Sequence, residues 1–161
     1  MDEKIIYSPI GIIHTPFTEA KKMPIQPAAA KGIEGTIDIK PEFENGLKYL
    51  DGFSHIILLY HLHLSKGFSL EVIPFLDDKP RGVFATRAPR RPNPIGLSIV
   101  RLVDIKKNRL NIRNVDVVDG TPLLDIKPYV PEFDDQKAEK IGWLSDKIDR
   151  MREIKSDERF K

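Results

Sequence analysis

Cysteine is absent from the 161 residues of the chain. Its absence excludes a disulfide scaffold, zinc held by thiolates and catalysis by a thiol. Long apolar runs are also missing, because the longest, Ile56–Tyr60, is far too short to cross a membrane. The first residues, Met1–Lys4, contain two acids and no apolar region of a secretory signal. We therefore expect a cytoplasmic protein.

The common signatures of nucleotide-binding and hydrolytic enzymes are missing as well. Gly32 and Gly35 are the only closely spaced glycines, and they match neither a dinucleotide-binding fingerprint nor a phosphate-binding loop. The sequence has no G-x-S-x-G elbow and no H-E-x-x-H pair. The residues alone therefore do not name a reaction.

The chain does have the composition of a globular domain and an uneven distribution of charge. Hydrophobic residues make up 40% and charged residues 31%, which suits one domain with a sizeable core. The net charge is only +2, yet ten Lys and Arg residues and a single acid, Asp104, fall between Lys79 and Arg113. Such a basic segment favours a polyanionic partner such as RNA.

Short β-branched and apolar runs separated by prolines predict a mainly β protein. We expect strands over residues 5–13, 35–39, 53–64, 69–76, 82–86, 95–105, 109–113 and 123–131, and a short helix over 41–47. Because no long amphipathic helices alternate with these strands, a doubly wound parallel sheet is unsuitable. The predicted architecture is a small antiparallel β-barrel, over about residues 4–131, within a single domain of residues 1–161.

A helix is expected after the barrel, over about residues 134–154, with Asp134 or Asp135 as its cap. Its apolar residues follow the spacing of one helix face: Ile141, Leu144, Ile148 and Met151. This face either covers the barrel or meets a second subunit.

A proline-rich loop between two predicted strands carries three arginines. Prolines at 89, 92 and 94 stiffen the loop, and Arg87, Arg90 and Arg91 lie on that rigid frame. Guanidinium groups held in this way suit the binding of a carboxylate or a phosphate. The alternative is a solvated basic turn.

Two histidines share one face at the end of the most apolar predicted strand. Residues 60–63 alternate strictly, which places His61 and His63 on the same side. Such a pair can chelate a metal, but the sequence signals no third ligand nearby. We therefore predict no metal and expect one of these histidines to contact a ligand at the strand end.

Four motifs, taken in order, resemble the TsaA-like family, whose characterised members are TrmO-type tRNA methyltransferases. They are IGIIHTPF (residues 10–17), GFSHI (52–56), ATRAPRRPNPIGLSIVRL (85–102) and DVVDGTPLLDIKPYVP (116–131). The resemblance implies a β-barrel, usually a homodimer, that binds S-adenosyl-L-methionine without a Rossmann sheet. The implied reaction is methyl transfer to N6 of threonylcarbamoyladenosine in the tRNA anticodon stem-loop. Longer members carry an extra C-terminal domain, so the chain is expected to be a short form without it.

The resemblance also implies four groups of cofactor contacts. They are the loop residues Gln26, Pro27 and Ala28; the strand end at His63 and Leu64; Arg87 with Leu97; and the turn at Asp119, Gly120, Thr121 and Pro122. Arg87 suits the carboxylate of the cofactor, and Asp119 suits its ammonium or ribose hydroxyls. Family members often have a polar residue in place of Leu64, which leaves only backbone contacts at that position.

Methyl transfer is an in-line displacement, so its catalysis depends mainly on positioning of the reactants. His63 and Asp119 are the candidates for a base that removes the proton of the acceptor nitrogen. Arg90 and Arg91 are expected to bind tRNA phosphates. Two other functions fit the same sequence: a module that binds S-adenosyl-L-methionine or a related nucleoside without turnover, and a plain RNA-binding barrel.

Overall fold

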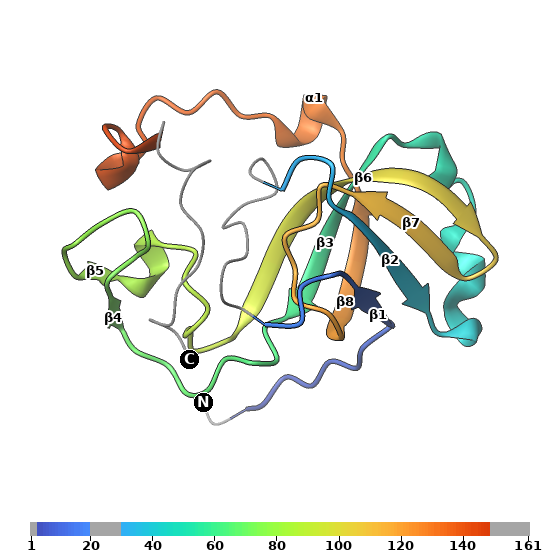
Figure 1. The fold of residues 1–161 in the computed structure, drawn as a ribbon, viewed down its shortest axis with the longest axis horizontal. Coiled ribbons are helices and arrows are strands. Elements are labelled where there is room, and N and C mark those ends of the chain that lie inside the picture. The colour runs from blue at the N-terminus through green and yellow to red at the C-terminus, as the bar shows by residue number, and fades with distance from the viewer. Residues whose placement is uncertain (1–2, 20–29, 149–161) are drawn as a thin grey trace.

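The computed structural model describes residues 3–19 and 30–148. Six antiparallel strands form a closed barrel in the order β1-β2-β7-β6-β3-β8, with β8 pairing back onto β1 (Figure 1). The strands are β1 (Gly11–His14), β2 (Glu34–Ile39), β3 (His55–His61), β6 (Ile95–Lys106), β7 (Arg109–Arg113) and β8 (Thr121–Pro128). The predicted antiparallel β-barrel is confirmed.

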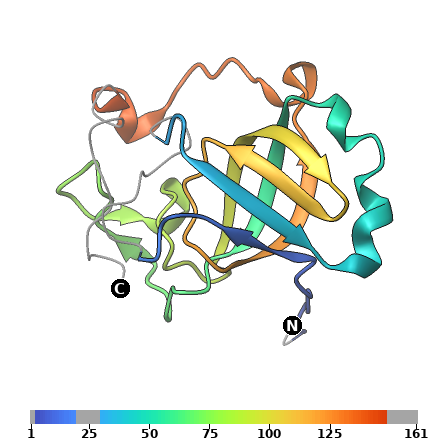
Figure 2. The ribbon, with the colours of Figure 1, turned by 45° about the vertical axis from the view of Figure 1, so that its right-hand side comes forward.

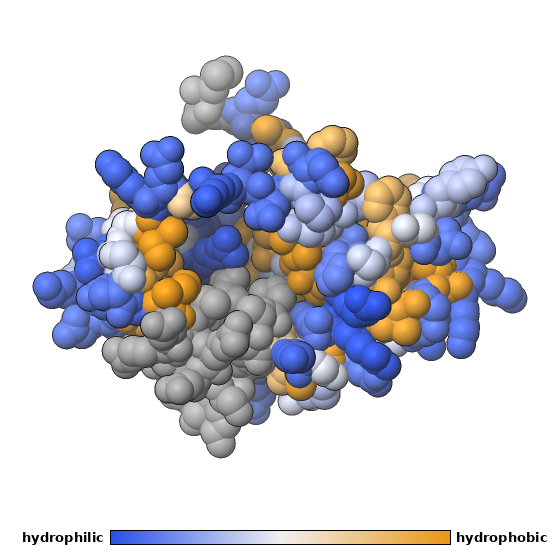
Figure 3. Space-filling model, turned by 90° about the horizontal axis from the view of Figure 1, so that it is seen from above, coloured by the Kyte–Doolittle hydropathy of each residue, from blue (hydrophilic) through white to orange (hydrophobic). Residues whose placement is uncertain are grey.

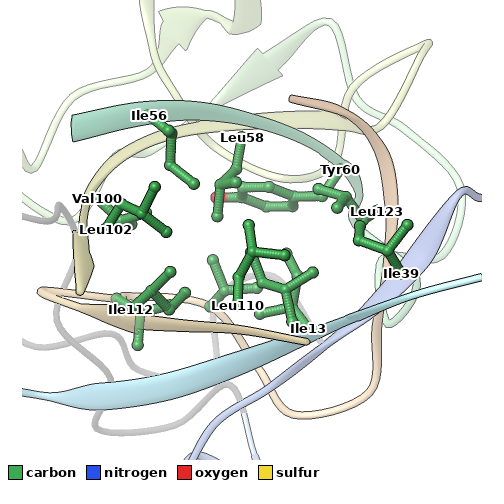
Figure 4. Packing of buried hydrophobic residues seen from close by; sticks show 13 residues of the cluster. Ile13, Ile39, Ile56, Leu58, Tyr60, Val100, Leu102, Leu110, Ile112 and Leu123 are labelled. Carbon is green, nitrogen blue, oxygen red and sulfur yellow. The ribbon is translucent and has the colours of Figure 1, made fainter. Parts of the chain in front are cut away.

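Alternation along the strands fills the interior of the barrel. On β3, Ile56, Leu58 and Tyr60 are buried, while the residues between them are more exposed. In a barrel every second residue of a strand faces inward, so these three side chains lie in the core. Figure 4 shows the inward-facing aliphatic side chains of the different strands meeting around the Tyr60 ring.

A small lobe lies beside the barrel, at the left in Figure 1. It contains the two-stranded sheet of β4 (Glu71–Val72) and β5 (Arg81–Gly82), followed by the 3₁₀ helix η4 (Val83–Ala85). The strand predicted over 82–86 is therefore wrong beyond Gly82. The Val83 carbonyl accepts hydrogen bonds from the Thr86 amide (3.1 Å) and the Thr86 hydroxyl (2.8 Å), which close a turn instead of a ladder.

Two other predicted strands are shorter than expected. The run over 5–13 enters the barrel only at Gly11, and Ile6, exposed by 86%, has no sheet to pack against. Pro9 lacks the amide hydrogen that would extend the ladder toward it. The run over 69–76 forms only β4.

Two 3₁₀ helices, η2 (Pro41–Leu47) and η3 (Leu50–Gly52), connect β2 to β3 and lie at the right of the barrel in Figure 1. They confirm the short helix predicted over 41–47. Leu47 and Leu50 pack against the main core, so these helices cover one end of the barrel.

The long helix expected over 134–154 is wrong in its described part. Only one helical turn, α1 (Pro131–Asp134), and one 3₁₀ turn, η5 (Gly142–Leu144), form between residues 131 and 148. Gly142 has a φ of +59°, which interrupts the helical path that the apolar spacing requires. Ile141 and Ile148 remain more than 40% exposed. Residues 149–154, with Met151, lie outside the described residues.

The segment over 135–148 instead runs from the barrel to the small lobe (Figure 2). Trp143 Nε1 donates to the Ala85 carbonyl (2.8 Å), and Lys147 Nζ contacts the buried Asp77 carboxylate (2.7 Å). Arg81 Nε donates to the other oxygen of Asp77 (2.6 Å). These cations hold the pKa of Asp77 well below its usual range. No helix in the part of the chain that the structure describes is long and apolar enough to cross a membrane.

Candidate functional site

The antiparallel register brings three strand ends together at one end of the barrel. The end of β3 meets the starts of β6 and β8, with His61 opposite Ile95 and Tyr60 opposite Leu123. β1 also ends beside the start of β8. We call this end the barrel mouth and include in it the connecting segments 62–65, 86–94 and 115–121. Most of the residues predicted to be functional fall in this region.

A hydrogen-bonded chain of three side chains lies at the inner side of the barrel mouth. The Tyr60 hydroxyl is 2.8 Å from Ser98 Oγ, and Ser98 Oγ donates to Asp116 Oδ1 at 2.7 Å. Because the Ser98 proton is used toward the carboxylate, Tyr60 is the donor to Ser98. The chain joins β3, β6 and the segment before β8 inside the barrel.

The surroundings of this chain shift its ionisations. Burial raises the pKa of the Asp116 carboxyl to about 6, and hydrogen bonds from Ser98 and from the Asp116 amide, with the positive charge of Arg87, limit the rise. Burial, reinforced by the charge of Asp116, keeps the pKa of the Tyr60 phenol well above its usual range. The charge of Arg87 acts on both groups, which places its guanidinium beside the barrel mouth.

The structure brings two of the predicted cofactor residues together. The Thr121 hydroxyl, buried at the start of β8, lies 3.4 Å from His63 Nδ1 and donates to the Val118 carbonyl at 2.7 Å. Burial, and then the charge of His61, lowers the pKa of His63, so its imidazole is neutral near pH 7. A neutral His63 can donate or accept one hydrogen bond at the barrel mouth.

Asp119 is used in a different way. Its Oδ1 accepts a hydrogen bond from the Thr15 amide (3.1 Å) and lies 3.3 Å from His14 Nδ1. The other ring nitrogen of His14 lies 3.4 Å from Asp38. Asp119 therefore fastens the turn before β8 to the end of β1, and Gly120, with a φ of +79°, allows that turn.

The arginines of the proline loop differ in their surroundings. Arg91 Nη1 donates to the carbonyls of Val83, Thr86 and Ala88 at 2.8–3.2 Å, so this side chain holds its own loop together. Arg90 Nε is buried and has no hydrogen-bond partner within residues 3–19 and 30–148. Arg91 was predicted to contact RNA, but in the structure its guanidinium hydrogen bonds to the backbone of its own loop.

The remaining predicted cofactor residues lie apart from this inner group. Leu97 is 49% exposed on the outer face of β6, and Leu64 is 47% exposed in the turn after β3. Gly120 and Pro122 line a shallow hollow of about 660 Å³ on the outside of β1 and β2. Gln26, Pro27 and Ala28 lie outside the described residues.

Sequence reasoning missed Tyr60, Ser98 and Asp116 as a group. Tyr60 and Ser98 occur in apolar strands, where they look like ordinary core and filler positions. Asp116 is the one charged residue between Val115 and Val117, both of them buried. An acid inside such an apolar alternation was the available signal.

Hydrophilic residues cover much of the face seen in Figure 3. Figure 3 shows hydrophobic side chains in separate patches among hydrophilic ones on the face seen from above. Phe84, 75% exposed, is one hydrophobic residue of the small lobe, and the Arg91 guanidinium lies 5.9 Å from its ring centre. An exposed aromatic ring beside a cation suits contact with a nucleic acid base.

Comparison with known proteins assigns this barrel to a family. The sequence matches the tRNA-methyltransferase O N-terminal domain over residues 12–135. The chain belongs to the tRNA-methyltransferase O family. The matched range holds the barrel strands, except for the first residue of β1, and the whole barrel mouth.

Individual relatives agree with the family. A protein of Pyrococcus abyssi named as a probable S-adenosyl-L-methionine-binding protein is 58% identical over 97% of this chain and 85% of its own length. The tRNA (adenine(37)-N6)-methyltransferase of Escherichia coli is 36% identical over 78% of this chain. The crystal structure of TrmO from Pseudomonas aeruginosa superposes with a TM-score of 0.74 at 38% identity over 88% of this chain.

The lengths of these relatives differ. The chain covers 57% of the Escherichia coli protein and 63% of the Pseudomonas aeruginosa structure. It covers most of the Pyrococcus abyssi relative. The similarity to the two longer proteins is therefore a similarity to their barrel portion.

Proposed function

We propose that the protein transfers a methyl group from S-adenosyl-L-methionine to N6 of an adenosine next to the anticodon of tRNA. The observation that carries the proposal is the match to the tRNA-methyltransferase O N-terminal domain, which includes the barrel mouth. The Escherichia coli relative named for this activity is 36% identical to this chain over 135 residues.

The residues at the barrel mouth fit the chemistry of S-adenosyl-L-methionine. Arg87 supplies a cation for its carboxylate, and His63 and Thr121 supply neutral polar groups for its hydroxyls or adenine edge. Gln26, Pro27, Ala28, Leu64, Leu97, Asp119, Gly120 and Pro122 remain proposed contacts by family resemblance. When bound, S-adenosyl-L-methionine supplies an electrophilic methyl group.

The finer proposal is that the acceptor is N6 of threonylcarbamoyladenosine. The experiment incubates purified protein and S-adenosyl-L-methionine with tRNA that carries this nucleoside, and measures anticodon-loop nucleosides by mass spectrometry. Matched tRNA with unmodified adenosine at the same position is the control. We expect a gain of one methyl group only on the modified nucleoside. Methylation of neither tRNA contradicts the enzyme proposal.

A second candidate function is binding of S-adenosyl-L-methionine without turnover. The observation in its favour is that the Pyrococcus abyssi relative, of similar length, is named for binding rather than transfer. Calorimetric binding of S-adenosyl-L-methionine together with an unmethylated nucleoside profile would support this function. No binding of S-adenosyl-L-methionine would leave the plain RNA-binding barrel.

We also propose a cytoplasmic homodimer. The outer faces of β3 and β6 present paired apolar residues, with Ile57 opposite Ile99 and Leu59 opposite Leu97. Val103, on the same outer face of β6, is 44% exposed. An apolar sheet face of this kind is stabilised by burial against a partner. Light scattering after size exclusion, on the wild type and on Val103→Glu, tests this assembly.

A further inference from the structure

Asp77 is buried and Asp116 is half-buried, and the partners of their carboxyl groups differ. The Asp77 carboxylate is ion-paired with Arg81 and Lys147. Asp116, by contrast, receives a hydrogen bond from the neutral Ser98 hydroxyl. Two adjacent cations hold a carboxylate in its charged form, whereas a neutral donor in a buried site leaves it able to take up a proton.

Asp116 lies in segment 115–121 of the barrel mouth, and hydrogen bonds hold its carboxyl in place. Oδ1 accepts the hydrogen bond from Ser98, and the backbone amide of Asp116 itself also hydrogen bonds to the carboxyl. Residues of β3 and β6 fix the position of Ser98. The Tyr60 hydroxyl hydrogen bonds to Ser98, and the Tyr60 ring packs over Gly96. The carboxyl is therefore oriented before any ligand arrives.

The titratable and charged groups facing Asp116 come from two elements. β3 contributes Tyr60, which is protonated at all physiological pH values, and the proline loop contributes Arg87. β6 contributes only the neutral Ser98. Among the described residues, Asp116 is therefore the group of this cluster that changes its charge near neutral pH.

We propose that Asp116 is the proton acceptor of the methyl-transfer reaction, held in place by Ser98 and Tyr60. This inference rests on the proposed function. In the step, the acceptor nitrogen forms a bond to the methyl carbon, and the carbon–sulfur bond of the sulfonium donor breaks. The bonding pair returns to sulfur, which becomes a neutral thioether. The proton of the nitrogen passes to the Asp116 carboxylate, which becomes a neutral carboxylic acid.

The two candidates from sequence are less suited to this task. Asp119 Oδ1 is shared by the Thr15 amide and His14, and its side chain is 41% exposed to water. His63 Nδ1 lies 3.4 Å from the Thr121 hydroxyl, so one of its ring nitrogens already has a partner within the protein. It suits ligand positioning at the barrel mouth. Asp116 combines a fixed orientation with limited access to solvent.

The first experiment measures the single-turnover methylation rate against pH for wild type and Asp116→Asn. Since the folded pKa of Asp116 is raised to about 6, the carboxylate that accepts the proton forms only as pH rises through that value. The wild-type rate should therefore increase through pH 6 and level off above it. In Asp116→Asn we expect at least a 100-fold loss of rate and no such limb, in line with the usual contribution of general bases.

A second readout does not depend on activity. In protein labelled at the aspartate carboxyl carbons, the Asp116 resonance should titrate with a midpoint near pH 6. Ser98→Ala removes the hydrogen bond that lowers the pKa of Asp116, so both the resonance midpoint and the rate limb should move to higher pH. If Asp116→Asn fails to fold, Ser98→Ala still decides the proposal.

Asp104→Asn is the matched control. Asp104 lies near the end of β6, six residues after Ser98, and accepts a hydrogen bond from Asn111 of β7. The Asp104→Asn variant should show the same rise of the methylation rate through pH 6 as the wild type. If Asp116→Asn keeps the rise of the methylation rate through pH 6, the inference is overturned and the proposed function is left intact. The same holds if this rise has the same midpoint in wild type and Ser98→Ala. An inactive wild type with modified tRNA overturns both, whatever the resonance shows.

Discussion

Tyr60 of β3 pairs with Gly96 of β6, and the Tyr60 ring fills the space that a side chain at position 96 would occupy. A Cβ placed on Gly96 would overlap the Tyr60 ring, far inside any van der Waals contact. The ring lies over the glycine and carries its hydroxyl to Ser98. A glycine near the start of β6 thus leaves the space in which the Tyr60 ring reaches Ser98 of the Asp116 cluster.

Gly96→Ala should therefore destabilise the protein and weaken the cluster. Overpacking of a filled core costs about 1–3 kcal/mol, and here the displaced side chain is the one that holds Ser98. Urea denaturation measures the change in unfolding free energy. Gly46→Ala is the control, because its Cβ would meet nothing within 4 Å. Equal stability of the two variants would contradict this packing.

Arg91 is a second residue whose role is visible only in the fold. One guanidinium nitrogen binds three backbone carbonyls of its own loop. We expect Arg91→Ala to lower the unfolding free energy by about 2 kcal/mol, because hydrogen bonds to a charged group are lost. Hydrogen exchange should quicken between residues 83 and 91. Protection equal to that of the wild type in this loop would show that the prolines alone keep it ordered.

The segment over 135–148 is the element whose structure depends most on distant contacts. Two cations lie near the Trp143 ring, with Arg81 at 5.6 Å and Lys147 at 5.7 Å from its centre. Both cations also bind the buried Asp77. The small lobe and this segment are therefore held by one cluster of cations, an aromatic ring and a carboxylate.

Trp143→Ala should release this segment from the small lobe without unfolding the barrel. It removes the hydrogen bond to Ala85 and the ring that both cations contact. Limited proteolysis should then cleave within residues 135–148 faster, while barrel melting stays within a few degrees. Phe133→Ala, a substitution of an exposed aromatic in α1, is the control. Identical cleavage rates in both variants would argue against docking through Trp143.

The barrel could be predicted from sequence because alternation and turn residues are local signals. Local signals have a limit at residues 115–117. Their alternation predicts an extended segment, but it does not identify the residue that hydrogen bonds to Asp116. That partner, Ser98, is set by the closure of six strands. The apolar spacing after residue 134 was misleading, because Trp143 and Lys147 bind a lobe that the sequence did not predict as a unit.

At the scale of the molecule, positive charge gathers on the segment that leads into the barrel mouth. Arg87 and Arg90 lie in the loop before β6, and Lys66 lies in the turn that Ser65 ties to the Pro89 carbonyl. Long-range attraction of tRNA phosphates to this region would bring the anticodon loop toward the proposed site.

Arg90→Ala should weaken tRNA binding and make it less sensitive to salt. Loss of one phosphate contact reduces the slope of log affinity against log salt by about 1. Affinity for S-adenosyl-L-methionine should stay unchanged. Filter binding over a range of salt concentrations measures the slope, and Arg101→Ala, an exposed arginine of β6 outside the loop, is the comparison. An unchanged slope for Arg90→Ala would remove Arg90 from the proposed interface.

The ring of strands closes between β1 and β8, whose paired residues are more than 100 positions apart in the chain. Contacts of such long sequence separation slow folding, because the ends of a long loop must meet before they are stabilised. During synthesis, β1 has no second neighbour until residues 121–123 have left the ribosome. The edges of an open sheet are prone to wrong pairing in that interval. The last closing pairs therefore set the moment at which Asp116 and its partners can first be enclosed.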